Sequence, residues 1–142
     1  MADKFNAATP KRPGGTCPLN APLLRLDLPA ACAQLKQEPT WASNDRNALT
    51  LFKSDILRLV LTALHAGATM KTHSAPGTIS VQVLEGRLTF DTAQHSTLLA
   101  AGQLLVLQAG IPHSVTALEE AVFLLYLAAG EDASPATPSL YP

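Results

Sequence analysis

Eight short β-prone runs follow one another from residue 48 onward, and this succession constrains the fold more than any other feature. The runs are ALTLFK, ILRLVLTALH, TISVQVLE, RLTFD, STLLA, QLLVLQ, HSVTAL and AVFLLYLA. Each is bounded by Gly, Pro, Asp, Asn or Ser, which are residues that favour turns. No amphipathic helix of ordinary length fits after residue 48. Many short strands separated by turns predict an all-β sandwich or barrel.

Length and charge narrow the class of protein further. A chain of 142 residues predicts one domain, and 47% hydrophobic residues suffice for one sizeable core. The 10 Lys and Arg residues nearly balance the 11 Asp and Glu residues, and no basic block appears. We therefore expect no nucleic-acid partner and no anionic membrane surface as partner. The apolar runs are far shorter than the roughly 20 residues that cross a bilayer. The segment MADKFNAATPKRPGG also lacks the apolar stretch of a secretory signal, so we expect a cytoplasmic protein.

Composition divides the chain into four segments. They are a mobile N-terminal arm (1–20), an N-terminal extension (21–47), a barrel (48–130) and a polar, Pro-rich tail (131–142). Within the extension, 22–28 (PLLRLDL) predicts a short strand. Residues 29–37 (PAACAQLKQ) predict a short helix, because proline at a helix start is followed by good helix formers. Residues 38–47 are polar and turn-rich, and Trp41 is expected to pack against the barrel or a partner subunit. Cys17 and Cys32 have no local partner and are interpreted as two unpaired thiols.

Two glycine–histidine frames stand out within the barrel segment. The first runs from Gly67 through ATMKT to His73, then Ser-Ala75, PGT, Ile79, SVQVLE and Gly86. The second runs from Gly102 through QLLVL to Gln108, then Ala-Gly110, Ile-Pro, His113 and, after three more residues, Ala117. In the strand that follows His73, alternation places Ile79, Val81 and Val83 on one face and Ser80 and Gln82 on the other.

The two frames resemble the paired motifs of the cupin superfamily in spacing and in wording (VQVLEGRLTF, AGQLLVLQAGIPHSV). The family's motifs read G-x5-H-x-H-x3,4-E-x6-G and G-x5-P-x-G-x2-H-x3-N. The resemblance covers residues 48–129 and identifies a small single-domain cupin. It implies a double-stranded β-helix, or jelly-roll barrel, to which the N-terminal strand and helix are an extension.

The resemblance also implies a metal centre, from which this chain departs. In the family that the chain resembles, the usual site has three histidines and one carboxylate around iron, manganese, nickel, copper or zinc. Here Ala75 replaces the second histidine and Ile79 replaces the glutamate, so only His73 and His113 stand at ligand positions. Three protein ligands are usual in catalytic sites. Neither His65, His95 nor Gln82 is a good substitute.

The predicted pocket therefore differs in its side chains from the metal site that the resemblance implies. His73 and His113 form its polar focus, and Ile79, Val81 and Val83 form an apolar wall where relatives carry a charge. Ala75 and Gln108 are expected to lie beside them, with the Gln108 amide facing the pocket. Three interpretations of the two histidines stay open: an incomplete metal site completed by substrate, a metal-free site that hydrogen-bonds a ligand or acts as acid and base, and a structural pair.

Three functions are compatible with such a pocket, because the fold alone does not select a function. The first is binding of a small organic molecule without turnover. The second is an enzyme, either metal-dependent and dioxygenase-like with a reduced ligand set, or an isomerase or lyase. The third is a structural or regulatory module that acts through a dimer surface. A homodimer is what the resemblance to small cupins implies, since these pair their sheets edge to edge or face to face. An open sheet edge, which a neighbour's strand can cover, adds to this expectation.

Overall fold

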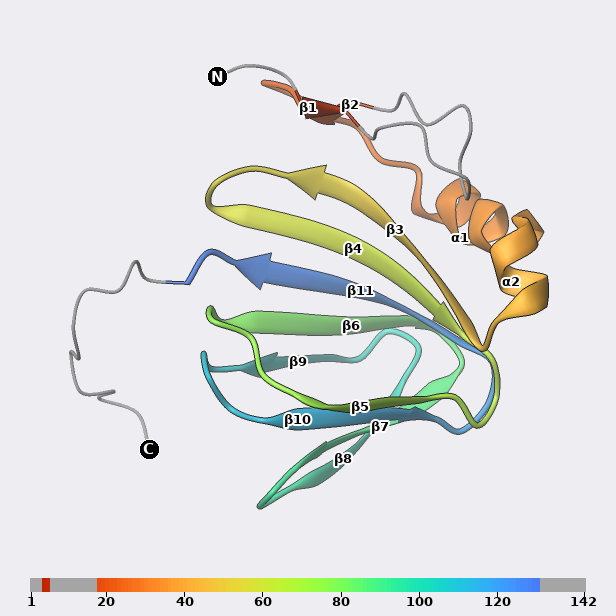
Figure 1. The fold of residues 1–142 in the computed structure, drawn as a ribbon, viewed down its shortest axis with the longest axis vertical. Helices are drawn as coiled ribbons and strands as arrows, with labels where there is room; N and C mark the ends of the chain where they lie inside the picture. The colour runs from red at the N-terminus through yellow and green to blue at the C-terminus, as the bar shows by residue number, and fades with distance from the viewer. Residues whose placement is uncertain (1–3, 6–17, 131–142) are drawn as a thin grey trace.

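The computed structural model describes residues 4–5 and 18–130, which form an all-β barrel with two short helices on its outside (Figure 1). A five-stranded antiparallel sheet has the order β3-β4-β11-β6-β9, and a four-stranded sheet has the order β5-β10-β7-β8. The first contains β3 (Arg46–Lys53), β4 (Leu57–Leu64), β11 (Ala121–Ala128), β6 (Ile79–Glu85) and β9 (Leu104–Leu107). The second contains β5 (Thr69–His73), β10 (His113–Ala117), β7 (Arg87–Thr92) and β8 (Ser96–Ala100). The predicted all-β jelly-roll class is confirmed.

Each of the eight predicted runs forms a strand. The structure also contains one strand in this region, β5, that the sequence did not predict. Its sequence, TMKTH, has one apolar residue, and four of its five residues are exposed. Without an apolar alternation it carries no strand signal. Its extended conformation comes instead from pairing with β10, in which Thr69 and Met70 lie opposite Thr116 and Val115.

The inner faces of the two sheets share one hydrophobic core. Ile79, Val81 and Val83 are 3%, 2% and 0% exposed, which confirms that this face of β6 points into the barrel. The intervening Gln82 lies on the opposite face, where its side chain accepts a hydrogen bond from the hydroxyl of Tyr126 at 3.1 Å. Alternation along β6 therefore determines which residues are available to a pocket inside the barrel.

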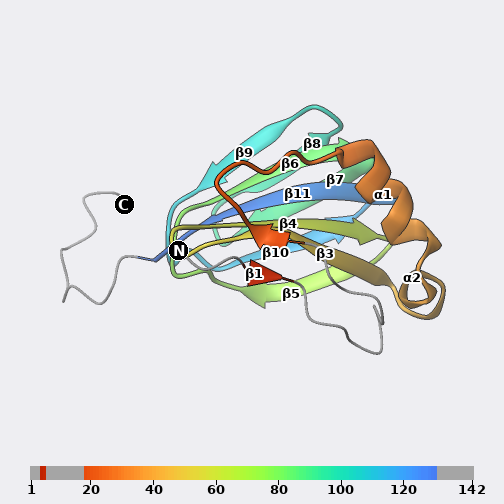
Figure 2. The ribbon, with the colours of Figure 1, turned by 90° about the horizontal axis from the view of Figure 1, so that it is seen from above.

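The N-terminal extension covers the outer face of the five-stranded sheet. Helices α1 (Leu28–Gln37) and α2 (Pro39–Ser43) lie along one end of that face (Figure 2). Leu35 of α1 and Trp41 of α2 enter a second hydrophobic cluster with residues of β3, β4 and β11. The expectation that Trp41 packs against the barrel is confirmed. The buried Asn47 side chain joins these layers, because its amide donates to the Leu35 carbonyl at 3.0 Å and to Glu38 at 2.8 Å.

Of the expectations for the extension, the helix is correct, the strand is wrong and the turn-rich segment is wrong in part. The helix predicted at 29–37 is present, and the Asp27 side chain caps it by accepting from the Ala30 amide at 3.0 Å. The strand predicted at 22–28 is absent, because the segment turns at Pro22 and Leu23 and ends in the cap of α1. The polar segment 38–47 contains α2 and the start of β3 rather than turns alone.

The two ends of the chain are described only in part. Most of the predicted arm lies outside the described residues, apart from β1 (Lys4–Phe5) and β2 (Pro18–Asn20), which pair with each other. The predicted tail, 131–142, lies outside them entirely. Among the residues that the structure describes, no helix is both long enough and apolar enough to span a membrane.

Candidate functional site: an apolar cavity with a histidine pair

A cavity of about 220 Å³ opens at the end of the barrel where β5 and β9 run into the loops that lead to β6 and β10. This end lies away from the two helices (Figure 1). Both sheets contribute to its wall. The lining residues are Met70, His73, Ser74, Ala75, Pro76, Ile79, Val81, Phe90, His113, Val115, Phe123, Leu125 and Leu127.

Five of the seven residues predicted for the pocket lie together around this cavity: His73, Ala75, Ile79, Val81 and His113. The other two do not line it. Val83 is fully buried further along β6, in the core beyond the cavity.

Gln108 is exposed in the turn after β9, so the expectation that its amide faces the pocket is wrong. The loop that contains Gln108 approaches the site with its backbone instead. The Gly110 amide donates to the Ala75 carbonyl at 2.8 Å.

The sequence alone did not reveal the part of the wall formed by Phe123, Leu125 and Leu127. These residues alternate along β11, but AVFLLYLA is apolar almost throughout, so no periodicity marks which face points inward. Pairing decides it, because Leu125 and Leu127 lie opposite Val81 and Ile79 of β6. Phe90 was also missed, although its position in the alternating RLTFD was a usable signal.

Strand pairing brings the two histidines together. His73 ends β5, His113 begins β10, and the two residues are directly opposite each other in the antiparallel ladder. Their imidazole rings meet edge to face, with centroids 4.4 Å apart and planes inclined by 63°. Phe90 of β7 stacks on the other side of the His113 ring, with centroids 5.0 Å apart and planes inclined by 15°. His113 is 4% exposed, whereas His73 is exposed at the mouth of the cavity.

Both rings are held by the same kind of hydrogen bond. Nδ1 of His113 lies 2.9 Å from the carbonyl oxygen of Ile111, and Nδ1 of His73 lies 2.6 Å from that of Lys71. A carbonyl oxygen only accepts, so Nδ1 is the nitrogen that carries the hydrogen. In each neutral ring Nε2 is therefore left with a free lone pair.

The Nε2 atom of His113 is accessible despite the burial of its ring. It has no hydrogen-bond partner among the described residues. Those residues nevertheless contain no buried side-chain nitrogen or oxygen that lacks a partner. Because Nε2 of His113 has no partner, it is not one of the buried atoms. It is therefore exposed to the cavity that His113 lines.

No family profile matches the chain, and no curated protein matches it. Solved structures do match. A cupin-2 domain protein from Shewanella frigidimarina is 15% identical, with a TM-score of 0.59, over 72% of this chain and 93% of that chain. The chain has the cupin fold. A conserved protein of unknown function from Streptococcus pyogenes is 31% identical, with a TM-score of 0.58, over 61% of this chain and 76% of that chain. A salicylate 1,2-dioxygenase variant from Pseudoaminobacter salicylatoxidans is 21% identical, with a TM-score of 0.55, and only 26% of its length is covered.

The donor atoms of this chain do not fit a resident catalytic metal. Within residues 18–130, no three His, Cys, Asp or Glu side chains lie close enough together to hold an ion. The positions of the missing ligands are occupied by the methyl group of Ala75 and the buried side chain of Ile79, both in the cavity wall. Two imidazoles fall short of the three protein ligands that a catalytic zinc or iron site normally has.

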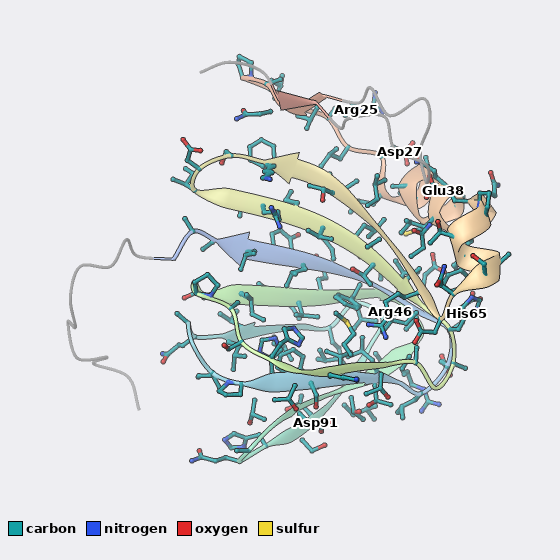
Figure 3. All side chains as sticks on the ribbon, viewed as in Figure 1. Arg25, Asp27, Glu38, Arg46, His65 and Asp91 are labelled. Carbon is teal, nitrogen blue, oxygen red and sulfur yellow. The ribbon has the colours of Figure 1, made fainter. Side chains whose placement is uncertain are left out.

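The other two histidines of the chain lie elsewhere. His65 stacks on Trp41, with ring centroids 3.4 Å apart, and its Nε2 lies 2.8 Å from the Trp41 carbonyl oxygen. It is at the end of the barrel next to the helices (Figure 3). His95 is exposed in the turn between β7 and β8. His65 is thus part of the packing around Trp41, and His95 lies on the surface.

Burial of His113 predicts a pH-dependent stability. Desolvation lowers the pKa of His113 below its ordinary value of about 6.5. The hydrogen bond to Ile111 partly opposes this shift, and the nearby His73 adds to it. The unfolded chain therefore binds a proton more readily than the folded one, so stability is full above about pH 6.5 and falls as the pH drops below that value.

Urea unfolding of wild-type protein and His113→Gln at pH 7.5, 6.5 and 5.5 measures this linkage. We expect the wild type to lose more stability than the variant between pH 6.5 and 5.5. Parallel losses in the two proteins would show that His113 titrates normally in the folded state.

Proposed function

We propose that this cupin binds a small organic molecule in the barrel cavity, with His73 and His113 as its polar contacts. The observation that carries the proposal is the make-up of the wall. Apart from the two histidines and Ser74, every described residue that lines the cavity is apolar. Concave, mostly apolar sites with a few convergent polar groups are the usual form of small-molecule sites.

The size of the cavity limits the ligand. An apolar protein cavity of about 150 Å³ holds benzene, and this one has about 220 Å³. A molecule with one ring, or a chain of similar volume, therefore fits. Transfer of its apolar surface from water supplies most of the binding free energy, at about 25 cal/mol per Å² buried. The imidazoles then determine its orientation.

Ligand-observed NMR with a set of one-ring compounds tests the proposal on untagged protein. We expect some of these compounds to bind and to compete with one another for the same site. They should no longer bind to the Ile79→Trp variant, in which the larger side chain fills the cavity. His95→Trp, at an exposed turn position, is the matched control and should leave binding intact. Absence of any binder, or binding that survives the filled cavity, would contradict the proposal.

A metal-dependent enzyme with a reduced ligand set is the second candidate. It is favoured by the two Nδ1 hydrogen bonds to backbone carbonyls, which orient metal-binding histidines in many proteins. This function would require the substrate to complete the metal's coordination, because the chain's described residues supply two donors. The fold shared with a dioxygenase does not by itself extend that activity to this chain.

The homodimer is also a proposal, and the edge strand β9 is where it can be tested. Strand β9 pairs with β6 on one side, and its Val106 is 65% exposed. The segment 101–118 contains no charged residue that would discourage pairing with another strand. If a second copy covers this edge, light scattering after gel filtration should show a wild-type dimer and a monomeric Val106→Lys variant. Leu23→Lys, changed at a residue 90% exposed, should remain dimeric, and a monomeric wild type would overturn the proposal.

A further inference from the structure

Resting on the function proposed above, we propose that the ligand is a neutral hydrogen-bond donor, an apolar one-ring compound with a hydroxyl group such as a simple phenol. The ligand's hydroxyl would donate to the free Nε2 of His113 at the inner end of the histidine pair. The proposal excludes carboxylates, phosphates and polyols as the preferred ligands of this cavity.

The imidazole pair offers a ligand hydrogen-bond acceptors and no donors. Nδ1 of His113 donates to Ile111, and Nδ1 of His73 donates to Lys71. Each neutral ring has one hydrogen, which these bonds use, so each Nε2 accepts only. Burial also lowers the pKa of His113, which favours the neutral ring. A ligand group that itself only accepts, such as a carboxylate, would place its lone pairs against those of the imidazole.

The cavity wall lacks a cationic side chain within the part of the chain that the structure describes. Neither Lys nor Arg is among the described residues that line the cavity. Lys71 is near in sequence, but it contacts His73 through its backbone carbonyl, and the residue is exposed. An anion would therefore give up its hydration without gaining an opposite charge, which is a large penalty.

The polar groups of the cavity are too few for a polyol. The side chains offer two Nε2 atoms and the Ser74 hydroxyl, which lies at the exposed mouth. Met70, Val115, Phe123, Leu125 and Leu127 form much of the remaining wall. A sugar placed there would leave most of its hydroxyl groups without partners, and each such loss is unfavourable. One hydroxyl on an apolar ring matches both the wall and the acceptor.

Three compounds of nearly the same shape test the ligand class: 4-methylphenol, toluene and 4-methylbenzoate. Their affinities for the full chain are measured by NMR titration at pH 8, where ordinary imidazoles are neutral, with and without a metal chelator. We expect 4-methylphenol to bind about fivefold more tightly than toluene, the gain typical of one hydrogen bond. We expect 4-methylbenzoate to bind more weakly than toluene, and the chelator to change nothing.

His113→Leu removes the acceptor while keeping an apolar side chain of moderate size. It should lower the affinity for 4-methylphenol to that for toluene, whereas His95→Leu should change neither. The three-ligand comparison on wild-type protein stands by itself if His113→Leu does not fold. If toluene or 4-methylbenzoate binds more tightly than 4-methylphenol, or if the chelator abolishes binding of 4-methylphenol, the proposed ligand class is wrong. The cavity would still be a ligand-binding site. Failure of all three compounds to bind would instead overturn the cavity as an organic-ligand site.

Discussion

Gly86→Ala is expected to destabilise the barrel by about 2–5 kcal/mol, because it combines backbone strain with a steric overlap. Gly86 joins β6 to β7 with a φ of +75°, which a residue with a Cβ adopts at a cost of about 1–2 kcal/mol. A Cβ at this position would also overlap the Glu120 carbonyl oxygen and lie 2.9 Å from the Ala121 Cα. Chemical denaturation followed by circular dichroism measures the loss.

Gly102→Ala is the matched control for this substitution. Gly102 has a similar φ of +88°, but a Cβ there would meet no atom of the described residues within 4 Å. Its substitution should therefore cost only the backbone strain, about 1–2 kcal/mol. Equal losses at the two positions would show that the β10–β11 turn yields to the new methyl group, and would contradict the tight packing of Gly86 against it.

Leu35→Ala is expected to cost about 2–5 kcal/mol, as large-to-small substitutions in a core do. Leu35 is the fully buried residue of α1, in the cluster between the helices and the outer face of the five-stranded sheet. The same sheet carries Ile79 and Val81 of the cavity wall on its other face. The helices therefore support the sheet that forms the site.

Leu23→Ala serves as the comparison, since Leu23 is 90% exposed and should change stability by less than about 0.5 kcal/mol. Both variants are measured by urea denaturation with tryptophan fluorescence, which reports the packing of Trp41 in the same cluster. A small effect of Leu35→Ala would mean that the extension is attached only loosely.

Local patterns in the sequence determine most of the barrel. Alternation in TISVQVLE and the glycines at turns suffice to predict strands such as β6 and their buried faces, because strand periodicity and turn geometry are local properties. Strand β5 and the docking of α1 and α2 depend on partners distant in the sequence. The pairing of His73 with His113 and the contact between Asn47 and Leu35 show this dependence.

The part of the candidate site that depends on the spacing of residues within the two glycine–histidine frames was predictable from the sequence. The two glycine–histidine frames place His73 and His113 correctly in relation to Ile79 and Val81. The orientation of Gln108 was not predictable in this way, because the residue follows the end of β9 and no strand alternation applies to it. Nor could the sequence show that both Nδ1 atoms donate to backbone carbonyls, since that depends on the conformation of residues 71–73 and 111–113.

Elemental analysis by mass spectrometry tests most directly whether His73 and His113 serve the proposed organic-ligand site rather than a metal site. Untagged wild-type protein, His73→Ala, His113→Ala and the control His95→Ala are each incubated with iron, manganese, nickel, copper or zinc and then desalted. We expect metal contents far below stoichiometric in every protein, because two imidazoles fall short of the three protein ligands of a catalytic metal site. Near-stoichiometric metal in the wild type and in His95→Ala, lost in both other variants, would contradict this expectation and make the metal-dependent enzyme the better interpretation.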